Sequence, residues 1–206
     1  MLEKAPPGSR ESIKRLALEL LVRRGYRGLS FGDLAAALGT TRANIHYHFG
    51  NKARLIDEVL SDYVSETLGA LATIWRDDGL LLPAKIEAII AYSRKRYLRF
   101  NPAPGHVAPW SLISRLRQDE DLLSDTGRAS LRRFTDELDG IVRAALAAAD
   151  QRGELLPQAS PQALALLLVN TADNAAPITL AGGGFERLED SYRAVLHVSG
   201  FGRPPS

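Results

Sequence analysis

Apolar residues recur along most of the chain at the three- and four-residue spacing of amphipathic helices, and no segment alternates strictly as a strand would. In the N-terminal third this spacing predicts a helix over residues 9–24, two short helices around Gly39 and a long helix from Asn51 to Trp75. The helices predicted beyond that point cover residues 83–100, 106–118, 125–152, 160 to the glycines at 182–184, and 185–198. The pattern therefore predicts an all-α protein of about nine helices.

Residues 29–49 have the pattern of two short helices joined by a glycine turn. Ser30 is a favourable N-cap for the first helix, and Gly39 is the residue expected to stop it. Thr40 or Thr41 is then placed to cap the second helix. We interpret this segment as a helix-turn-helix, with the motif at about residues 30–50.

The second of these helices has only two apolar anchors, Ile45 and Phe49, which are spaced by four residues and so share one face. Its other face is left free to meet a partner. The first residues of this helix carry the hydroxyl, guanidinium, methyl and amide groups that read base edges in a major groove: Thr41, Arg42, Ala43 and Asn44.

Composition agrees with a globular helical protein. The chain has 206 residues, of which 45% are hydrophobic, so it is long enough for one large or two small helical domains. It has no cysteine, which excludes disulfides, thiolate catalysis and cysteine-ligated zinc. Residues 1–10 lack the apolar core of a signal peptide, and the most apolar run, residues 163–169, is far shorter than the roughly 20 residues of a membrane span. We therefore expect a cytoplasmic protein with no membrane segment.

Positive charge is concentrated on the segment that holds the motif. The formal net charge of the chain is only +2. Residues 9–54, however, carry nine basic side chains and three acidic ones, a formal charge of +6. Arginines also solubilise ordinary surface helices, but this coincidence of charge and motif favours a surface that binds a phosphate backbone.

The N-terminal third resembles the tetracycline-repressor (TetR) family of bacterial one-component regulators. The resemblance rests on Arg24-Gly25-Tyr26 and on four further segments, 30–35, 39–41, 45–49 and 51–55. It implies a DNA-binding domain over residues 9–69 and a C-terminal domain over residues 70–206 that dimerises and binds an effector. It also implies a transcriptional regulator, by family default a repressor, with no enzymatic activity and no cofactor.

The resemblance also implies roles for single residues. Ser30, Thr41 and Lys52 would contact the phosphate backbone, whereas Arg42 and Asn44 would read guanine and adenine and Ala43 would meet a thymine methyl. One departure concerns His46, which stands where the family most often has tyrosine. Tyr47, the next residue, would then supply part of that phosphate contact.

Metal binding and catalysis have little support in the sequence. His46 and His48 are spaced by two residues, which places them on different helix faces, whereas zinc-binding pairs on a helix are spaced by four. The chain also lacks a nucleophile elbow, a phosphate-binding loop and a His-Glu-x-x-His pattern. The alternative to a DNA-binding regulator is a small all-helical metabolite-binding protein or enzyme without DNA binding.

Candidate residues for an unidentified small-molecule effector are aromatic or polar side chains on otherwise apolar helices. Core packing is the alternative for each aromatic side chain, and the amides need hydrogen-bond partners of some kind. The expected set is Tyr92, Arg96, Trp110, Phe134, Asn170 and Asn174.

A homodimer is expected because one reading helix contacts too few bases, while two copies related by a twofold axis read a palindromic operator in double-stranded DNA. The last two predicted helices are the expected interface. Their apolar positions are Leu164, Leu167, Leu168, Ile178, Leu188, Tyr192, Val195 and Leu196.

Overall fold

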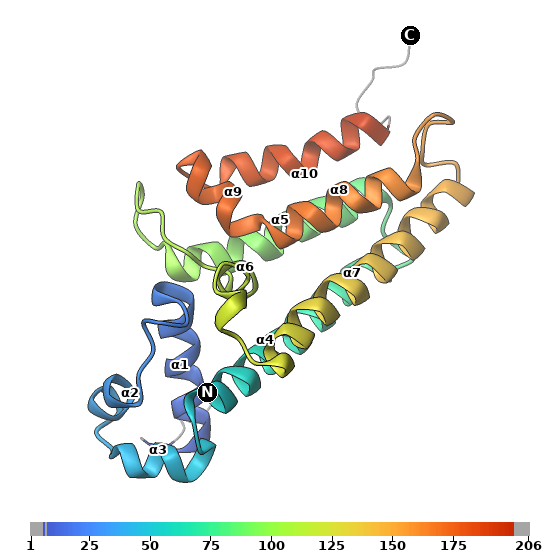
Figure 1. The fold of residues 1–206 in the computed structure, drawn as a ribbon. Coiled ribbons are helices and arrows are strands. Elements are labelled where there is room, and N and C mark those ends of the chain that lie inside the picture. The colour runs from blue at the N-terminus through green and yellow to red at the C-terminus, as the bar shows by residue number, and fades with distance from the viewer. Residues whose placement is uncertain (1–5, 7, 200–206) are drawn as a thin grey trace.

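The computed structural model describes residue 6 and residues 8–199, and these form helices and loops with no strand (Figure 1). Residues 1–5, 7 and 200–206, which include the end of the expected second domain, lie outside the described residues. The helices are α1 (Arg10–Arg24), α2 (Phe31–Leu38), α3 (Arg42–Phe49), α4 (Lys52–Trp75), α5 (Leu82–Phe100), α6 (Leu112–Arg117), the short 3-10 helix η1 (Glu120–Leu122), α7 (Asp125–Gln151), α8 (Pro161–Asp173), α9 (Ala175–Gly182) and α10 (Glu186–Ser199). The predicted all-α fold is confirmed.

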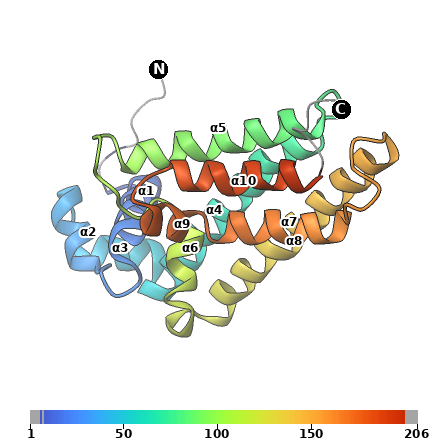
Figure 2. The same cartoon turned by 90° about the horizontal axis from the view of Figure 1, so that it is seen from above.

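The helices form a small N-terminal unit and a larger C-terminal bundle that share α4. Helices α1, α2 and α3 lie at one end of the molecule, and α4 runs from there alongside α7 (Figures 1 and 2). The first turns of α4 bury Leu55 and Ile56 against the N-terminal unit, and its later turns bury Leu68 and Leu71. The bundle continues with α8 packed on α7, and α10 packed on α5, α8 and α9.

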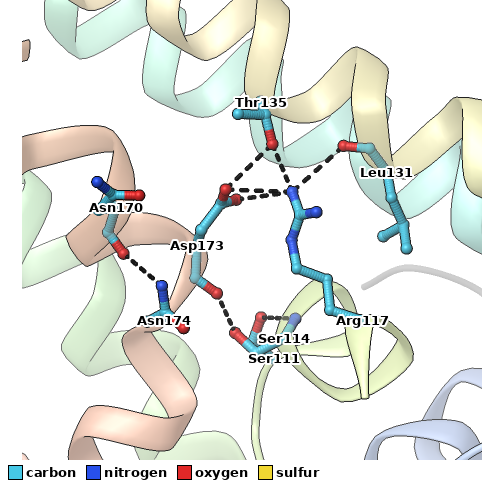
Figure 3. A network of polar contacts seen from close by, with 8 residues as sticks. All are labelled: Ser111, Ser114, Arg117, Leu131, Thr135, Asn170, Asp173 and Asn174. Atoms are coloured by element: carbon cyan, nitrogen blue, oxygen red, sulfur yellow. Dashed lines mark hydrogen bonds and ion pairs between the residues drawn. The ribbon is translucent and has the colours of Figure 1, made fainter. Parts of the chain in front are cut away.

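The helix expected between residue 160 and the glycines at 182–184 is in fact two helices. Helices α8 and α9 meet at Asn174 with a bend of 69°. Pro177 explains the break, because its ring nitrogen cannot donate to the carbonyl of Asp173 four residues earlier. Ser114 Oγ on α6 donates to that carbonyl instead, at 2.8 Å (Figure 3). A proline within a helix predicts such a bend, and the break raises the number of α-helices in the described part of the chain to ten.

An ion pair also stabilises the bend between α8 and α9. Arg117 Nη2 on α6 lies 3.0 and 3.1 Å from the two carboxylate oxygens of Asp173. The Thr135 hydroxyl on α7 donates to Asp173 Oδ2 at 3.1 Å (Figure 3). Asp173, which has a charge in an apolar helix, is therefore partnered within the subunit and joins α6, α7 and α8.

Helix α6 is shorter than predicted. The pattern predicts a helix over residues 106–118, but the helix begins at Leu112, with Ser111 as N-cap. Ala108 precedes Pro109, and a residue before proline is disfavoured in helical conformation. The Asn101 side chain also donates to the Ala108 carbonyl at 3.2 Å, which fixes this stretch as a loop.

Helix α8 is not buried on all sides, although residues 163–169 are all apolar, a pattern that predicts a helix buried against two neighbours. Leu164 and Leu168 are buried, whereas Leu166 is 57% exposed and Leu167 is 47% exposed. On α10, Leu188, Tyr192 and Val195 are also buried within the subunit. These five buried residues belong to the core of one chain, so of the eight expected interface residues only Leu167, Ile178 and Leu196 keep accessible surface.

Candidate functional site

Three caps build the turn between α2 and α3. The Ser30 hydroxyl accepts a hydrogen bond from the Asp33 amide at 3.1 Å, and Gly39 ends α2 with φ of 61° and ψ of 33°, a left-handed conformation that favours glycine. Thr41 is the N-cap of α3, since its hydroxyl accepts from the Asn44 amide at 3.1 Å. Of the two threonines that the sequence left open, Thr41 is therefore the cap.

Two side chains anchor α3, as predicted, and most of its remaining surface is free. Ile45 and Phe49 are fully buried. The exposed side chains of α3 are those of Arg42, Ala43, His46 and Tyr47, the last of which is 85% exposed. Helix α3 lies at the end of the molecule (Figure 1), and these four side chains make up its exposed face.

Asn44 and Ser30 are already engaged within the chain. Asn44 is half-buried, and its Nδ2 donates to the Gly8 carbonyl at 2.8 Å and to the Thr40 hydroxyl at 3.1 Å. The Ser30 hydroxyl donates to the Asp33 carboxylate at 2.8 Å. The structure therefore uses Asn44 to fasten α3 to the chain before α1, and it offers neither of the two as a free donor.

Arg42 lies against the first turn of α2. A Cβ atom added at Gly32 would lie 2.6 Å from Arg42 Nη2, so only glycine at position 32 leaves room for this placement. Arg42 has no ion-pair partner in the described part of the chain. His46, on the same face, has Nδ1 2.8 Å from the Gly50 carbonyl and packs its ring edge-on against Phe31 at 4.8 Å.

Lys52 begins α4 and lies next to the loop after α1. Its Nζ is 4.5 Å from the centre of the Tyr26 ring, a cation–π contact. Burial lowers the pKa of Lys52, and the nearby carboxylate of Asp119 acts in the opposite direction. Asp119 also accepts the Tyr26 amide at 2.8 Å, which ties the N-terminal unit to the segment after α6.

Part of the positive charge expected on the N-terminal unit is neutralised by α4. Arg10 pairs with Glu58, donates to the His48 carbonyl at 2.7 Å and stacks 4.6 Å from the Phe49 ring centre. Lys14 pairs with Asp62. These two cations hold α1 on α3 and α4, so the charge free to meet a phosphate backbone is smaller than +6.

The effector candidates Tyr92 and Arg96 line a cavity of about 310 Å³ between α1, α4 and α5. Arg96 Nη1 donates to the Tyr92 hydroxyl at 2.8 Å, and the guanidinium carbon lies 4.4 Å from the Tyr63 ring centre. Burial raises the pKa of Tyr92, so its hydroxyl stays protonated. The full lining is Leu18, Tyr63, Glu66, Tyr92, Lys95, Arg96, Arg99 and Phe100.

Trp110 and Phe134 line a second, inner void of about 40 Å³, which shares Tyr92 and Arg96 with the outer cavity. Trp110 Nε1 donates to the Thr179 hydroxyl at 2.9 Å. The structure therefore brings together the four expected residues on α5, α7 and the loop before α6. It does not bring Asn170 and Asn174 to them, because both are exposed, and Asn174 Nδ2 donates to the Asn170 carbonyl at 3.0 Å (Figure 3).

Sequence reasoning missed several residues that these sites use. Tyr63 and Thr67, one helical turn apart on α4, line the inner void, but they follow the same apolar period as ordinary core positions. Tyr26 and Asp119 meet only because the fold joins them across a separation of 93 residues. The i, i+4 spacing of Tyr92 and Arg96 was the one local signal of the cavity.

Metal sites and single membrane-spanning helices are not found among the described residues. No group of three or more histidine, aspartate or glutamate side chains is arranged to hold a metal ion there. No single helix in that part of the chain is long and apolar enough to cross a membrane; α8 and α9 meet the criterion only as a bent pair.

Comparison with known proteins gives matches in sequence and in fold. Residues 13–59 match the family model described as "Bacterial regulatory proteins, tetR family". A segment of 86 residues is 29% identical to the HTH-type transcriptional repressor KstR2 of Rhodococcus jostii, and this segment covers 42% of each chain.

The fold agrees over nearly the whole length. A TetR transcriptional regulator from Legionella pneumophila aligns with a TM-score of 0.77 and 20% identity, covering 97% of this chain and 100% of that one. A TetR-family regulator from Agrobacterium tumefaciens aligns with a TM-score of 0.76 and 23% identity, covering 93% and 97%. Residues 13–59, which include α2 and α3, are therefore similar to the tetR family of bacterial regulatory proteins, and the described chain has the fold of these solved regulators.

Proposed function

We propose that this protein is a DNA-binding transcriptional regulator, a repressor that binds a palindromic operator as a homodimer in the bacterial cytoplasm and responds to a small-molecule effector. The observation that carries the proposal is the exposed face of α3. This helix lies at the end of the molecule (Figure 1) and is fixed by two buried anchors, while Arg42, Ala43, His46 and Tyr47 are exposed. Such a helix has the size and chemistry to enter a major groove.

The residues of this face have separate roles. Arg42 is the base-reading candidate, because its guanidinium is exposed and matches the two acceptors of guanine. Thr41, His46, Tyr47 and Lys52 surround it as contacts to phosphates. Asn44 has a positioning role, because its side chain holds α3 to the chain before α1. We assign no catalytic role and no cofactor to any of these residues.

A homodimer is supported by apolar side chains that one subunit leaves in water. Leu166 and Leu167 on α8, Leu180 on α9 and Val198 on α10 are all exposed. Exposed apolar patches on a stable chain mark contact surfaces. Pairing two subunits through α8 and α10 would hold two reading helices at a fixed spacing, which a palindromic operator requires.

The test is binding of the purified protein to DNA from upstream of its own gene. Fluorescence anisotropy with a labelled duplex should give an affinity that falls steeply with salt concentration. Arg42→Ala should weaken specific binding by about 5- to 150-fold, equivalent to about 1–3 kcal/mol, and should relax the sequence preference. Lys52→Ala should weaken binding to all sequences equally and flatten the salt dependence.

Arg132→Ala is the matched control, because it removes the same charge from an exposed position on α7, far from α3. If the Arg42 and Arg132 variants bind the duplex equally well, α3 is not the reading element. If the parent protein binds no duplex selectively, the proposed function is wrong.

A further inference from the structure

We propose that the effector is a small organic acid with a flat apolar body, whose carboxylate binds Arg96 in the cavity between α1, α4 and α5. The inference rests on the proposed function only in calling this ligand an effector. The binding itself depends on the charge of the cavity, on its walls and on a buried hydroxyl next to it.

The mostly positive side chains that line the cavity favour an anionic ligand. Three cations, Lys95, Arg96 and Arg99, line it with a single acidic side chain, Glu66. Arg96 is only 20% exposed, and its closest carboxylate oxygen, on Glu66, is 3.9 Å away, beyond hydrogen-bond distance. A largely desolvated guanidinium is stabilised when a carboxylate accepts two of its N–H groups, so a ligand carboxylate supplies what Glu66 does not.

The hydrogen-bond donors of Arg96 also favour an anionic ligand. A guanidinium has five N–H donors. Arg96 gives one of them to the Tyr92 hydroxyl, at 2.8 Å, and the Tyr63 hydroxyl is a second acceptor beside it, so further N–H groups remain. Donors that face the cavity are therefore available to a ligand.

The walls of the cavity suit a flat apolar body. Arg96 lies over the ring faces of Tyr63 and Tyr92, at 4.4 and 5.4 Å from their centres, and Phe100 and Leu18 complete the apolar side. The volume of about 310 Å³ is at the lower end of the roughly 300–1,000 Å³ typical of ligand pockets. Both features favour an acid of one or two fused rings over a longer ligand.

The inner void supplies an independent sign of a missing partner. Thr67 Oγ lines this void, and the residue is only 7% exposed. Its hydroxyl meets no partner in good hydrogen-bond geometry in the described part of the chain, and the Tyr92 hydroxyl is its polar neighbour in the void. Buried hydroxyls are normally paired, and the void of about 40 Å³ is large enough for one water molecule or one ligand hydroxyl. This void and the outer cavity adjoin at Arg96 and Tyr92, which line both.

The experiment is isothermal titration calorimetry of the full chain with 2-naphthoate and with its neutral isostere, 2-naphthamide. We expect saturable binding of the acid and binding of the amide that is at least tenfold weaker, because the neutral amide cannot accept charge-assisted hydrogen bonds from the guanidinium. Arg96→Gln should reduce the affinity for the acid to that for the amide. Arg96→Lys, which keeps the charge but not the fork of donors, should be intermediate.

Arg94→Gln is the matched control. Arg94 lies on the same helix, pairs with Glu189 and stacks 4.7 Å from the Phe185 ring centre, so it has the same chemistry outside the cavity. This variant should bind 2-naphthoate as the parent does. Thermal unfolding of every variant checks that it is folded, and if Arg96→Gln does not fold, the comparison rests on Arg96→Lys.

The outcomes separate this inference from the proposed function. If the parent binds DNA but binds neither compound at millimolar concentration, or binds acid and amide equally, the inference is wrong and the proposed function stands. A loss in Arg94→Gln equal to that in the Arg96 variants would also overturn it. If the acid binds through Arg96 but no duplex is bound, the site is real and the proposed function fails. If both bind, linkage requires each to change the affinity for the other by the same factor.

Discussion

Removing the Asp173 carboxylate should destabilise the protein far more than removing a carboxylate from a surface ion pair. The Asp173 side chain is 12% exposed and that of its partner Arg117 is 28% exposed. The carboxylate receives Arg117 at 3.0 and 3.1 Å and the Thr135 hydroxyl at 3.1 Å. Asp173→Ala leaves a mostly buried guanidinium whose Nε already has no partner among the described residues.

The magnitude follows from what remains around Arg117. Breaking a buried ion pair by removing one partner costs about 3–5 kcal/mol. Arg117 would keep its bonds to the Thr135 hydroxyl and to the Leu131 carbonyl and has some contact with water, so it is not left wholly uncompensated. We therefore expect Asp173→Ala to lower the free energy of unfolding by about 2–3 kcal/mol.

Urea unfolding followed by circular dichroism measures this change. The protein concentration must be held constant, because the proposed homodimer would add to apparent stability. Asp139→Ala is the matched control: it removes the partly exposed i, i+4 partner of Arg143 on α7 and should cost much less than Asp173→Ala. The double variant Arg117→Leu, Asp173→Leu should lose less than Asp173→Ala, since no buried charge is left unpaired.

Two results would refute this reasoning. One is an Asp173→Ala variant no less stable than Asp139→Ala, which would mean that water solvates Arg117 fully at the corner. The other is a double variant whose loss equals the sum of the losses in the single Arg117→Leu and Asp173→Leu variants, which would mean that the two side chains do not act as a pair.

Three further predictions concern the N-terminal unit and the interface. Gly32→Ala should leave thermal stability equal or higher, because alanine favours helix, yet displace Arg42 and weaken specific DNA binding in anisotropy assays; unchanged binding would show that the contact at Gly32 is unimportant. Gly39→Ala should lower the free energy of unfolding by about 1 kcal/mol in urea, because the added Cβ meets no atom but the left-handed backbone disfavours it; no loss would contradict the cap. Leu167→Glu should give a folded monomer in light scattering with circular dichroism like that of the parent, and a variant that remains dimeric would exclude this face as the interface.

Local chemistry made the helix-turn-helix predictable. Ser30 and Thr41 cap residues three positions away, and Gly39 acts through its own backbone angles, so each signal is complete within one turn. Ile45 and Phe49 are likewise read from a single helical period. The same holds for the break near Pro177, which follows from the missing N–H of one residue.

Long-range pairing made the rest unpredictable. By its spacing, Asn44 should lie on the surface of α3. Its side-chain amide instead donates to the carbonyl of Gly8, 36 residues away, and is therefore not a free donor on the exposed face of α3. Which leucines of α8 are buried depends on where α7 and α10 pack, and periodicity cannot supply this for a helix apolar on nearly all sides. The cavity at Arg96 forms only where α1, α4 and α5 converge.

The hydrogen bond from the Tyr26 amide to Asp119 changes the mechanics of the joint between the two parts of the molecule. If the N-terminal unit were attached to the bundle through α4 alone, it could rotate about the axis of that helix. This hydrogen bond lies off that axis and, together with the packing of α1 on α6 and the ion pair between Arg99 on α5 and Glu19 on α1, opposes the rotation. We therefore expect the three N-terminal helices to move together with α4 and the segment after α6, so that a tilt of the bundle also tilts α3.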